Sequence, residues 1–532
     1  MCDISGPHTG AETCLAAIGA QDLHLLSDDP NRSLFKYNPK RHSNFRKYHR
    51  SRTINRSEPL TAENQWPLNQ TIKVQYDPRS MGDLLSNMYI KIEIPALPDQ
   101  DAMGVTNGKA YRYSDILGRH LFKSITMNVD EMTLEKYQDD WGYIHDKMYA
   151  DMSEINTQNY SLNRGMDPGF FQNNPAAVWN FDKTKTTLMI PIPFFFSRNY
   201  ESDDYETNEP GRPFFPLCAI NKQKLEFVFE FRPDTFFTDV SVAPNITSTQ
   251  YSNLSEEEKS FYELSGSGYK FKLHFDKFEI ITEEITLEPY ERMYYTNQEY
   301  KMITDIFIKH PTVDTAGEDN VKLDLVPKNR VKSFHWFFRN AKYEDETEPL
   351  GKFNSGFPIL DEVRWLEYIY IQNRFNLTHR ENYKRNVDSL SDDIMTSAKI
   401  FINGEELPNS NSNDNMYFKN HIPLLHRMTV PVQNIYTYTF SMFPRNVEPS
   451  GSIDFGNMKS NRTYLSCDID PSIHALSQVY RLNLYYKAYT TFTFKDGYLD
   501  VKGDTLQYGS LNSELDLESD GTNAVDCRIT YN

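Results

Sequence analysis

The sequence predicts an all-β protein built mainly from short antiparallel strands, and three observations support this fold class. Apolar residues recur at every second position in many short runs, which is the period of a half-buried strand. Asn403-Gly404 and Asp496-Gly497 stand between strand-like runs and can supply the positive φ that tight hairpins require. Hydrophobic residues make up 39% and aromatic residues 14% of the chain, which is enough for packed sheets and large interfaces.

The alternation is clearest in two runs. In residues 224–231 the odd-numbered positions are apolar and the even-numbered ones are mostly charged, and residues 270–276 repeat the pattern. We expect further strands within residues 88–94, 125–129, 321–325, 398–402, 436–442 and 481–485. One helix is expected from apolar side chains at three-and-four spacing, namely Leu134, Tyr137, Trp141, Ile144, Met148 and Met152.

Charged or turn-rich segments at residues 201–212, 243–268 and 343–358 are expected to be long surface loops. Residues 194–199 and 440–446 resemble each other, and each lies late in its own half of the chain. This internal similarity either indicates two tandem β domains or is a coincidence. A length of 532 residues also favours two large domains.

The five cysteines are scattered and have no zinc-site or redox-pair spacing, so we expect free, buried thiols in a reducing compartment. No apolar run is long enough for a secretory signal or a membrane span. The chain is therefore expected to be soluble and cytosolic when it is made.

The N-terminal region carries a charge opposite to that of the remaining chain. Residues 31–56 contain nine Lys or Arg and no Asp or Glu, in a protein of formal net charge −18. Subtracting these nine charges leaves about −27 for the other residues. Such a basic arm requires an acidic partner, which is a membrane, a nucleic acid or the protein's own acidic body.

Six stretches, read in order, carry a resemblance to a known family. They are residues 18–22 with 33–36 and 41–45, residues 79–89, 113–118 and 190–196, residues 291–300 with 331–340, and residues 397–404 with 449–451 and 461–465. None is specific alone, but their shared order resembles the major capsid proteins of nucleocytoplasmic large DNA viruses. The positive charges from Arg46 to Arg56 depart from the family pattern, which covers those up to Arg41.

The resemblance implies a double jelly roll, in which two eight-stranded antiparallel sandwiches follow each other and short helices lie in the connecting loops. It places the basic arm at residues 1–56, the first roll at 57–290, and the second roll with an acidic tail at 291–532. It further implies a homotrimer with a six-sided outline that joins neighbouring capsomers, minor capsid proteins and penton proteins in an icosahedral virion shell. Assembly is expected in the infected host cell, in its cytoplasm.

The family's N-terminal segments generally lie on the inward side of the shell, so we expect the arm to contact the interior. The expected inner-face residues are Arg41, His42, Phe45, Arg46, Lys47, Arg50, Arg52 and Arg56. Their partner is an internal membrane or an acidic minor capsid protein, and direct nucleic-acid binding is less favoured. The alternative is an arm folded against the acidic surface of its own or a neighbouring subunit.

An enzyme is not expected, and neither is a cofactor. His421 and His426 lack a third metal ligand nearby, and the pairs Glu283-Glu284 and Asp139-Asp140 would point to opposite faces of a strand. The rival function is a glycan-binding or glycan-cleaving β-sandwich, since the chain is rich in Tyr. Residues 331–338 and 365–370 are aromatic-rich candidates for the trimer interface, although aromatic strands belong to a core at least as often.

Overall fold

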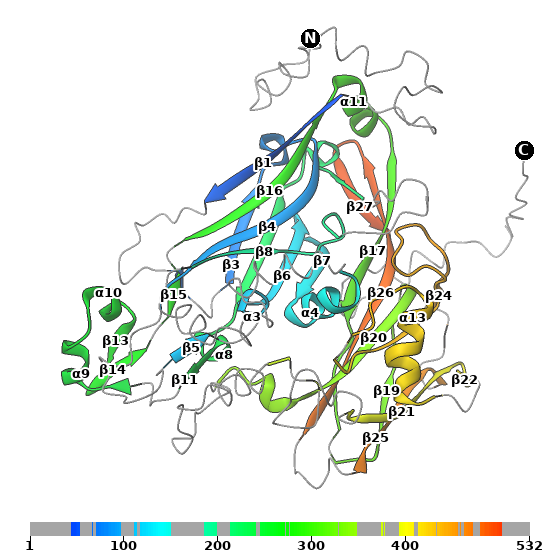
Figure 1. Cartoon of the computed structure of the whole chain (residues 1–532). Helices are drawn as coiled ribbons and strands as arrows, with labels where there is room; N and C mark the ends of the chain where they lie inside the picture. The colour runs from blue at the N-terminus through cyan, green and yellow to red at the C-terminus, as the bar shows by residue number, and fades with distance from the viewer. Residues whose placement is uncertain are drawn as a thin grey trace, which may run out of the picture.

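The structure is a computed structural model that describes most of the chain between residues 44 and 502 (Figure 1). The described residues are 44–53, 66–67, 71–96, 111–113, 117–150, 186–198, 213–240, 245–271, 273–275, 277–315, 317–327, 329–347, 374–375, 377, 393–408, 413–431, 433–455, 458, 462–471 and 479–502. Within them the fold consists of antiparallel sheets in two tandem halves, which we call the first roll and the second roll.

The first roll has two sheets. The larger has the order β1 (Phe45–Thr53), β16 (Phe278–Leu287), β4 (Leu84–Ile94) and β8 (Thr186–Pro191), with β9 (Phe215–Pro216) also paired to β4. The smaller has the order β3 (Thr71–Tyr76), β10 (Leu225–Phe231), β6 (Phe122–Val129) and β7 (Met132–Gln138). The apolar alternation of β10 faces the core between the two sheets, as residues 224–231 predicted.

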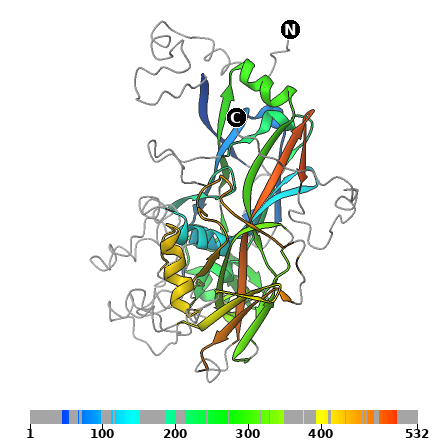
Figure 2. The same cartoon turned by 90° about the vertical axis from the view of Figure 1, so that its right-hand side faces the viewer.

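The second roll repeats this arrangement. Its larger sheet has the order β17 (Tyr300–Lys309), β26 (Tyr480–Lys495), β20 (Arg330–Asn340) and β23 (Tyr436–Thr439); β18 (Val313–Asp314) and β27 (Tyr498–Lys502) pair with β26, and β24 (Ile453–Asp454) with β20. Its smaller sheet has the order β19 (Asn320–Asp324), β25 (Tyr464–Ile469), β21 (Met395–Ile402) and β22 (Glu405–Leu407). Figure 2 shows the two rolls from the side.

The two rolls have the same strand order, position by position. In each, the strand that comes first in the chain lies at one end of the larger sheet and pairs with a strand from the end of that roll, so β1 corresponds to β17 and β16 to β26; β27 follows β26 as an additional strand. The similar segments 194–199 and 440–446 follow β8 and β23, which also occupy corresponding positions. The internal similarity therefore has a structural cause, which is the repeated roll.

The remaining elements are short. The helices are α3 (Leu117–His120), α4 (Asp139–Met148), α8 (Asp234–Phe237), α9 (Ser248–Ser252), α10 (Glu256–Lys259), α11 (Pro289–Asn297) and α13 (Ile422–Leu425), with helical turns η1 (Pro78–Ser80), η3 (Leu217–Ile220), η4 (Ala341–Tyr343) and η5 (Tyr417–His421). The short strands are β2 (Trp66–Pro67) with β15 (His274–Phe275), β5 (Tyr111–Tyr113) with β11 (Thr238–Val240), and β12 (Asn245–Ile246), β14 (Gly268–Phe271) and β13 (Tyr262–Ser265). The linker α11 joins the rolls, and the expected division at residue 291 lies within it.

The second roll's larger sheet is covered on both faces. Phe334, Trp336 and Phe338 of β20 belong to the second roll's own core. Phe307 and Phe337 belong to the apolar cluster that fills the first roll. The two halves therefore share one continuous apolar contact, with Phe307 stacked on Trp141 of α4.

Several expectations from the sequence were wrong in detail. The helix expected from Leu134 onward begins only at α4, because Leu134 and Tyr137 lie in β7, which passes directly into that helix. The strand expected at residues 270–276 is split between β14 and β15. The loop expected at residues 243–268 contains β12, α9, α10 and β13, whereas residues 201–212 lie outside the described part of the chain.

Other expectations are confirmed. Asn403-Gly404 and Asp496-Gly497 have positive φ and connect β21 to β22 and β26 to β27. Cys218 and Cys467 are free and buried, and the other three cysteines lie outside the described residues. Residues 331–338 were expected to be either core or trimer interface, and they are core, because all of them are buried inside the chain. Residues 365–370 lie outside the described ranges.

Candidate functional site

The basic N-terminal region reaches the first roll as strand β1. It pairs antiparallel with β16 along its whole length, from Phe45 opposite Leu287 to Thr53 opposite Glu279. The two strands have complementary charge, because β1 contains Arg46, Lys47, Arg50 and Arg52 and β16 contains three glutamates. The densest part of the expected arm therefore has an acidic partner within its own chain.

One set of contacts lies on the inner face of this strand pair. Glu284 is fully buried and lies 3.3 Å from Arg52 and 3.8 Å from Arg50. It also accepts hydrogen bonds from the backbone N–H of Gly82 at 2.6 Å and the hydroxyl of Tyr48 at 3.3 Å. A buried carboxylate is stable only when it is paired and hydrogen-bonded, so Arg50 and Arg52 compensate for burying Glu284.

A second set lies on the outer face. The ammonium group of Lys47 is 3.4 Å and the imidazole of His49 is 3.2 Å from Glu283, which also accepts a 2.8 Å hydrogen bond from Ser86. Burial would raise the pKa of Glu283, but the bond from Ser86 and the charge of Lys47 outweigh burial and lower that pKa. Glu283 and Glu284 thus point to opposite faces, as the sequence predicted.

The expected inner-face residues divide into three groups. Arg50 and Arg52 are half-buried against Glu284, whereas Lys47 is exposed but paired with Glu283. Phe45 and Arg46 lie at the exposed start of β1, with Phe45 51% exposed. Arg41, His42 and Arg56 lie outside the described residues. The inward contact of all eight remains a prediction.

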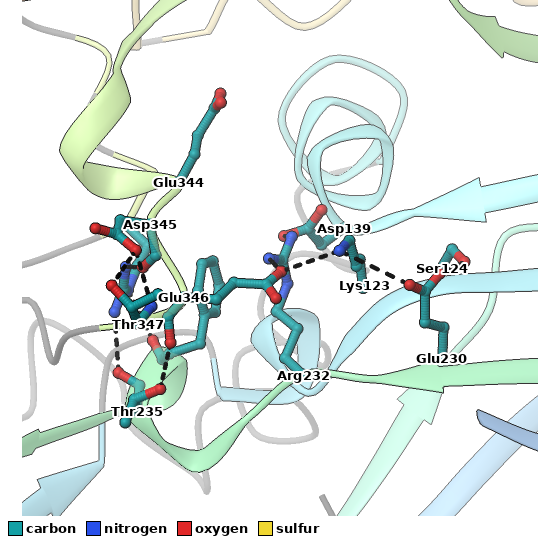
Figure 3. A network of polar contacts seen from close by, with 12 residues as sticks. Lys123, Ser124, Asp139, Glu230, Arg232, Thr235, Glu344, Asp345, Glu346 and Thr347 are labelled. Carbon is teal, nitrogen blue, oxygen red and sulfur yellow. Dashed lines mark hydrogen bonds and ion pairs between the residues drawn. The ribbon is translucent and has the colours of Figure 1, made fainter. Parts of the chain in front are cut away.

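A second charged site joins the two rolls. We call this contact the seam. Its first-roll side consists of α4, residues 192–198 and Arg232, and its second-roll side consists of β17, β20, β26 and residues 341–347. Arg232 of the first roll donates hydrogen bonds to Asp139 at 2.6 Å and to Glu346 of the second roll at 2.7 Å (Figure 3). Lys123 lies 3.5 Å from the same Glu346. Both rolls therefore contribute charges to one partly buried network, in which Arg232 and Asp139 are the buried members.

Asp140 is the neighbouring acid of the seam. It pairs with Arg339 of β20 and, at 2.9 Å, with Lys309 of β17. Burial would raise the pKa of Asp140, but the two cations hold it well below its usual range. Asp139 and Asp140 lie within the helix expected from the sequence and begin α4, where they also suit the positive end of the helix dipole.

A third buried cluster extends the seam toward residues 192–198. Arg198 is 2.6 Å from Glu135 and 3.6 Å from Asp305 of β17, and Asp305 is 3.1 Å from Lys332 and 3.0 Å from Lys487. Burial lowers the pKa of Lys487 to about 7 even though Asp305 opposes this shift. Because breaking a buried pair costs about 3–5 kcal/mol, these contacts resist any change in the angle between the rolls.

The sequence reasoning did not detect the seam, since its members are far apart in the chain. It also missed a second stretch without acids, from Met416 to Arg445, which contains His421, His426 and Arg427. In the structure His426 Nδ1 lies 3.1 Å from the carbonyl oxygen of Met442, and His421 is exposed. The charge distribution along the sequence was the signal that could have revealed this segment.

The described residues contain no cluster of three or more His, Cys, Asp or Glu side chains that could hold a metal ion. Within the same part of the chain no helix has both the length and the apolarity to cross a membrane. The charged groups described above are bound to each other across strand and roll boundaries. These ion pairs are suited to holding the strands and the two rolls together.

The comparisons with known proteins agree with this architecture. A family model described as the major capsid protein N-terminus matches residues 33–260, and one for the large eukaryotic DNA virus major capsid protein matches residues 291–498. No curated protein matches the chain. The first match ends at residue 260 and the second begins at residue 291, within α11; together they cover most of both rolls.

Solved structures share the fold. PBCV-1 VP54, fitted into a reconstruction of the virophage Sputnik, is 14% identical with a TM-score of 0.58, covering 88% of this chain and 99% of that one. The Faustovirus major capsid protein is 11% identical with a TM-score of 0.55, covering 92% of this chain and 99% of its own. The fold is therefore the double jelly roll, and this chain belongs to the major capsid proteins of large eukaryotic DNA viruses.

Proposed function

We propose that three copies of this major capsid protein form a capsomer with a six-sided outline, and that these capsomers tile an icosahedral shell. The observation that carries the proposal is the repeated strand order of the two rolls. Two similar rolls in each chain give three chains six similar building blocks, so a threefold assembly can occupy sixfold positions. The buried charges of the seam support it, because they hold the two rolls of each chain at one angle.

Purified protein tests this assembly state. The mass measured by light scattering is expected to be three times that of one chain, and negative-stain images are expected to show threefold particles with a hexagonal outline. A stable monomer over a wide concentration range would contradict the trimer. A monomer that binds oligosaccharides would instead favour the glycan-binding β-sandwich.

We propose that the end of the first roll that carries the start of β1 faces the interior of the shell. Figure 1 places this end of β1 beside α11. Tyr290, Met293 and Tyr294 of α11 are between 50% and 88% exposed, and Phe45 is exposed at the start of β1. Basic residues beside exposed aromatic residues suit an anionic membrane surface or an acidic minor capsid protein.

The different exposure of the side chains along β1 suggests two roles for the expected inner-face residues. Phe45, Arg46 and the preceding Arg41 and His42 are the proposed docking residues, whereas Arg50 and Arg52 hold β1 in its sheet through Glu284. Each cation near an anionic surface contributes about 1 kcal/mol at best, so attachment depends on many copies acting together. Direct binding of nucleic acid is the less favoured partner.

Charge reversal separates the two roles. Arg41→Glu with Arg46→Glu is expected to leave trimers intact and to release the shell from its interior contact. Arg52→Glu is expected to prevent stable folding, because it places a second carboxylate beside Glu284. Attachment of the wild-type shell that does not weaken with salt would contradict electrostatic docking.

The remaining proposals concern the other partners and the place of assembly. The chain is a component of the virion capsid and contacts neighbouring capsomers. We propose that minor capsid and penton proteins also bind it, and that it assembles in the cytoplasm of the infected cell. We assign it no enzymatic activity, because members of the family act as structural proteins of the shell.

A further inference from the structure

The second roll exposes an apolar surface formed by the segment between β22 and β23 and by the turn that follows β23. Its exposed side chains are Met416, Leu424, Leu425, Val430, Met442 and Phe443. We call these six residues the α13 patch. Leu424 is 69% and Leu425 60% exposed, and the bond from His426 to the carbonyl of Met442 holds the two parts of the patch together. Single exposed apolar residues are ordinary, but a group of this kind indicates a contact surface.

The first roll shows what such a helix does. In each roll a helix follows an edge strand of the smaller sheet along the chain: α4 follows β7, and α13 lies between β22 and β23. The helix of the first roll packs on the second roll's larger sheet. Trp141 stacks on Phe307, and Tyr149, directly after the helix, lies 2.8 Å from His335. In the described residues, α13 has no such sheet covering Leu424 and Leu425.

The larger sheets of the two rolls differ in how much of their outer face is buried. In β20 every residue from Val331 to Asn340 is buried, because the first roll covers one face and the second roll's core the other. In the corresponding strand β4, Met88, Ile90 and Ile92 are buried in the core, while Tyr89 and Lys91 are only half-buried. Along β4 the outer face of the first roll's larger sheet is therefore less covered than along β20.

We propose that the α13 patch of one subunit packs on the outer face of the β1-β16-β4-β8 sheet of a second copy of this chain. The proposal rests on the trimer proposed above and gives its interface. Each roll then contributes one helix to the next roll's larger sheet. Three such contacts between chains alternate with the three seams within chains, so the ring closes.

Position and charge support a second copy as the occupant. Thr429 beside the patch donates a 3.1 Å hydrogen bond to the carbonyl of Met148, so the patch continues directly from the seam. Figure 2 shows α13, in yellow, along one side of the molecule. The stretch from Met416 to Arg445 has no acidic residue, whereas the whole chain has a net charge of −18. The negative charge of a second copy therefore attracts the basic residues of this stretch.

Aspartates in the patch test the contact. Leu424→Asp with Leu425→Asp is expected to weaken trimer association by at least roughly tenfold, because a carboxylate would be buried without a partner. Leu264→Asp in β13 is the matched control, since Leu264 is 68% exposed and lies outside both proposed surfaces. Circular dichroism and thermal unfolding of the monomer check that each variant folds.

A crosslink tests which surfaces meet. Leu425→Cys combined with Lys91→Cys is expected to give dimers and trimers with a short thiol crosslinker, beyond what either single variant gives. Leu425→Cys with Leu264→Cys serves as the control pair.

This interface would be wrong if the aspartate variants form trimers as tightly as the wild type and the Leu425→Cys, Lys91→Cys pair gives no specific crosslink. The trimer itself would still stand. Intact trimers that fail only in shell assembly would also overturn the interface, by assigning the patch to contacts between capsomers. A wild-type protein that is monomeric would instead overturn the proposed trimer.

Discussion

The backbone N–H of Gly82 donates a 2.6 Å hydrogen bond to the carboxylate of Glu284, whose Cβ leaves no room for a side chain at position 82. A methyl group at Gly82 would lie 2.8 Å from that Cβ and 3.2 Å from the carbonyl oxygen of Ile285. Glu284 also binds Arg52 of β1, so it connects the N-terminal strand to the turn that precedes β4. This buried carboxylate is what fixes the basic strand in the first roll.

Glu284→Gln is therefore expected to destabilise the first roll by about 2–4 kcal/mol, because Arg50 and Arg52 lose their counter-charge in a largely buried site. Chemical unfolding monitored by tryptophan fluorescence measures the change. Glu256→Gln is the control: its side chain is 90% exposed and paired only with Lys259 on the surface, so a loss below about 0.5 kcal/mol is expected. Equal losses in the two variants would show that Glu284 is not the anchor.

Asp140→Asn is expected to destabilise the seam by about 3–5 kcal/mol, because it removes the counter-charge of buried Arg339 and weakens the contact with Lys309. Hydrogen exchange is expected to increase in α4 and β20, on both sides of the seam. Asp324→Asn is the surface control, since its carboxylate is exposed and lies 3.3 Å from exposed Lys322. Increased exchange confined to α4 would contradict a role in joining the rolls.

The strands were predictable where one face of a sheet meets an apolar core and the other does not. The alternation in residues 224–231 identified β10 for that reason. Strand β1 was not predicted, because the residues that it places against the roll are Tyr48, Arg50 and Arg52 rather than apolar ones. Their partner Glu284 lies more than two hundred residues later, so nothing local in the sequence marks the pairing.

The same limit applies to the helices and to the seam. Apolar residues in β7 and α4 keep a three-and-four spacing across the point where the strand becomes a helix, so periodicity alone predicted a single helix. Asp139-Asp140 was visible as an acidic pair, but its cations Arg232 and Arg339 come from two different rolls. The family resemblance supplied the double roll; the charges that hold its halves together required coordinates.

His335 predicts how stability depends on pH. It is fully buried among Trp141, Phe307 and Tyr149, and burial, helped by the charge of Lys487, lowers the pKa of His335 to about 3. The unfolded chain binds a proton on this side chain below about pH 6.5, whereas the folded protein does not until about pH 3. Stability is therefore expected to fall as the pH falls through this window, by at most roughly 1.4 kcal/mol per pH unit from this group.

His335→Gln is expected to flatten that pH dependence while lowering stability at neutral pH, since the contacts with Tyr149 and Thr437 are disturbed. His120 is also fully buried, and burial lowers its pKa well below the usual value, so some slope remains in the single variant. Unfolding midpoints measured from pH 7 down to about pH 4 give the slope. A slope equal to that of the wild type would rule out His335 as its source.

Gly142→Ala in α4 is expected to destabilise the protein by about 1–3 kcal/mol, although alanine favours an isolated helix by about 1 kcal/mol over glycine. The reason is the close approach of Tyr137, whose ring carbon Cζ would lie 2.8 Å from the new methyl group and whose hydroxyl would lie closer still. Tyr137→Phe in the Gly142→Ala background is expected to recover part of the loss, because it removes the clashing hydroxyl. Tyr137→Phe also removes the 3.1 Å hydrogen bond that Arg119 donates to Tyr137. A double-mutant cycle measured by thermal unfolding separates the energy of the contact between residues 137 and 142 from the loss of that bond. If Gly142→Ala raises the melting temperature instead, helix propensity outweighs the packing of β7 against α4.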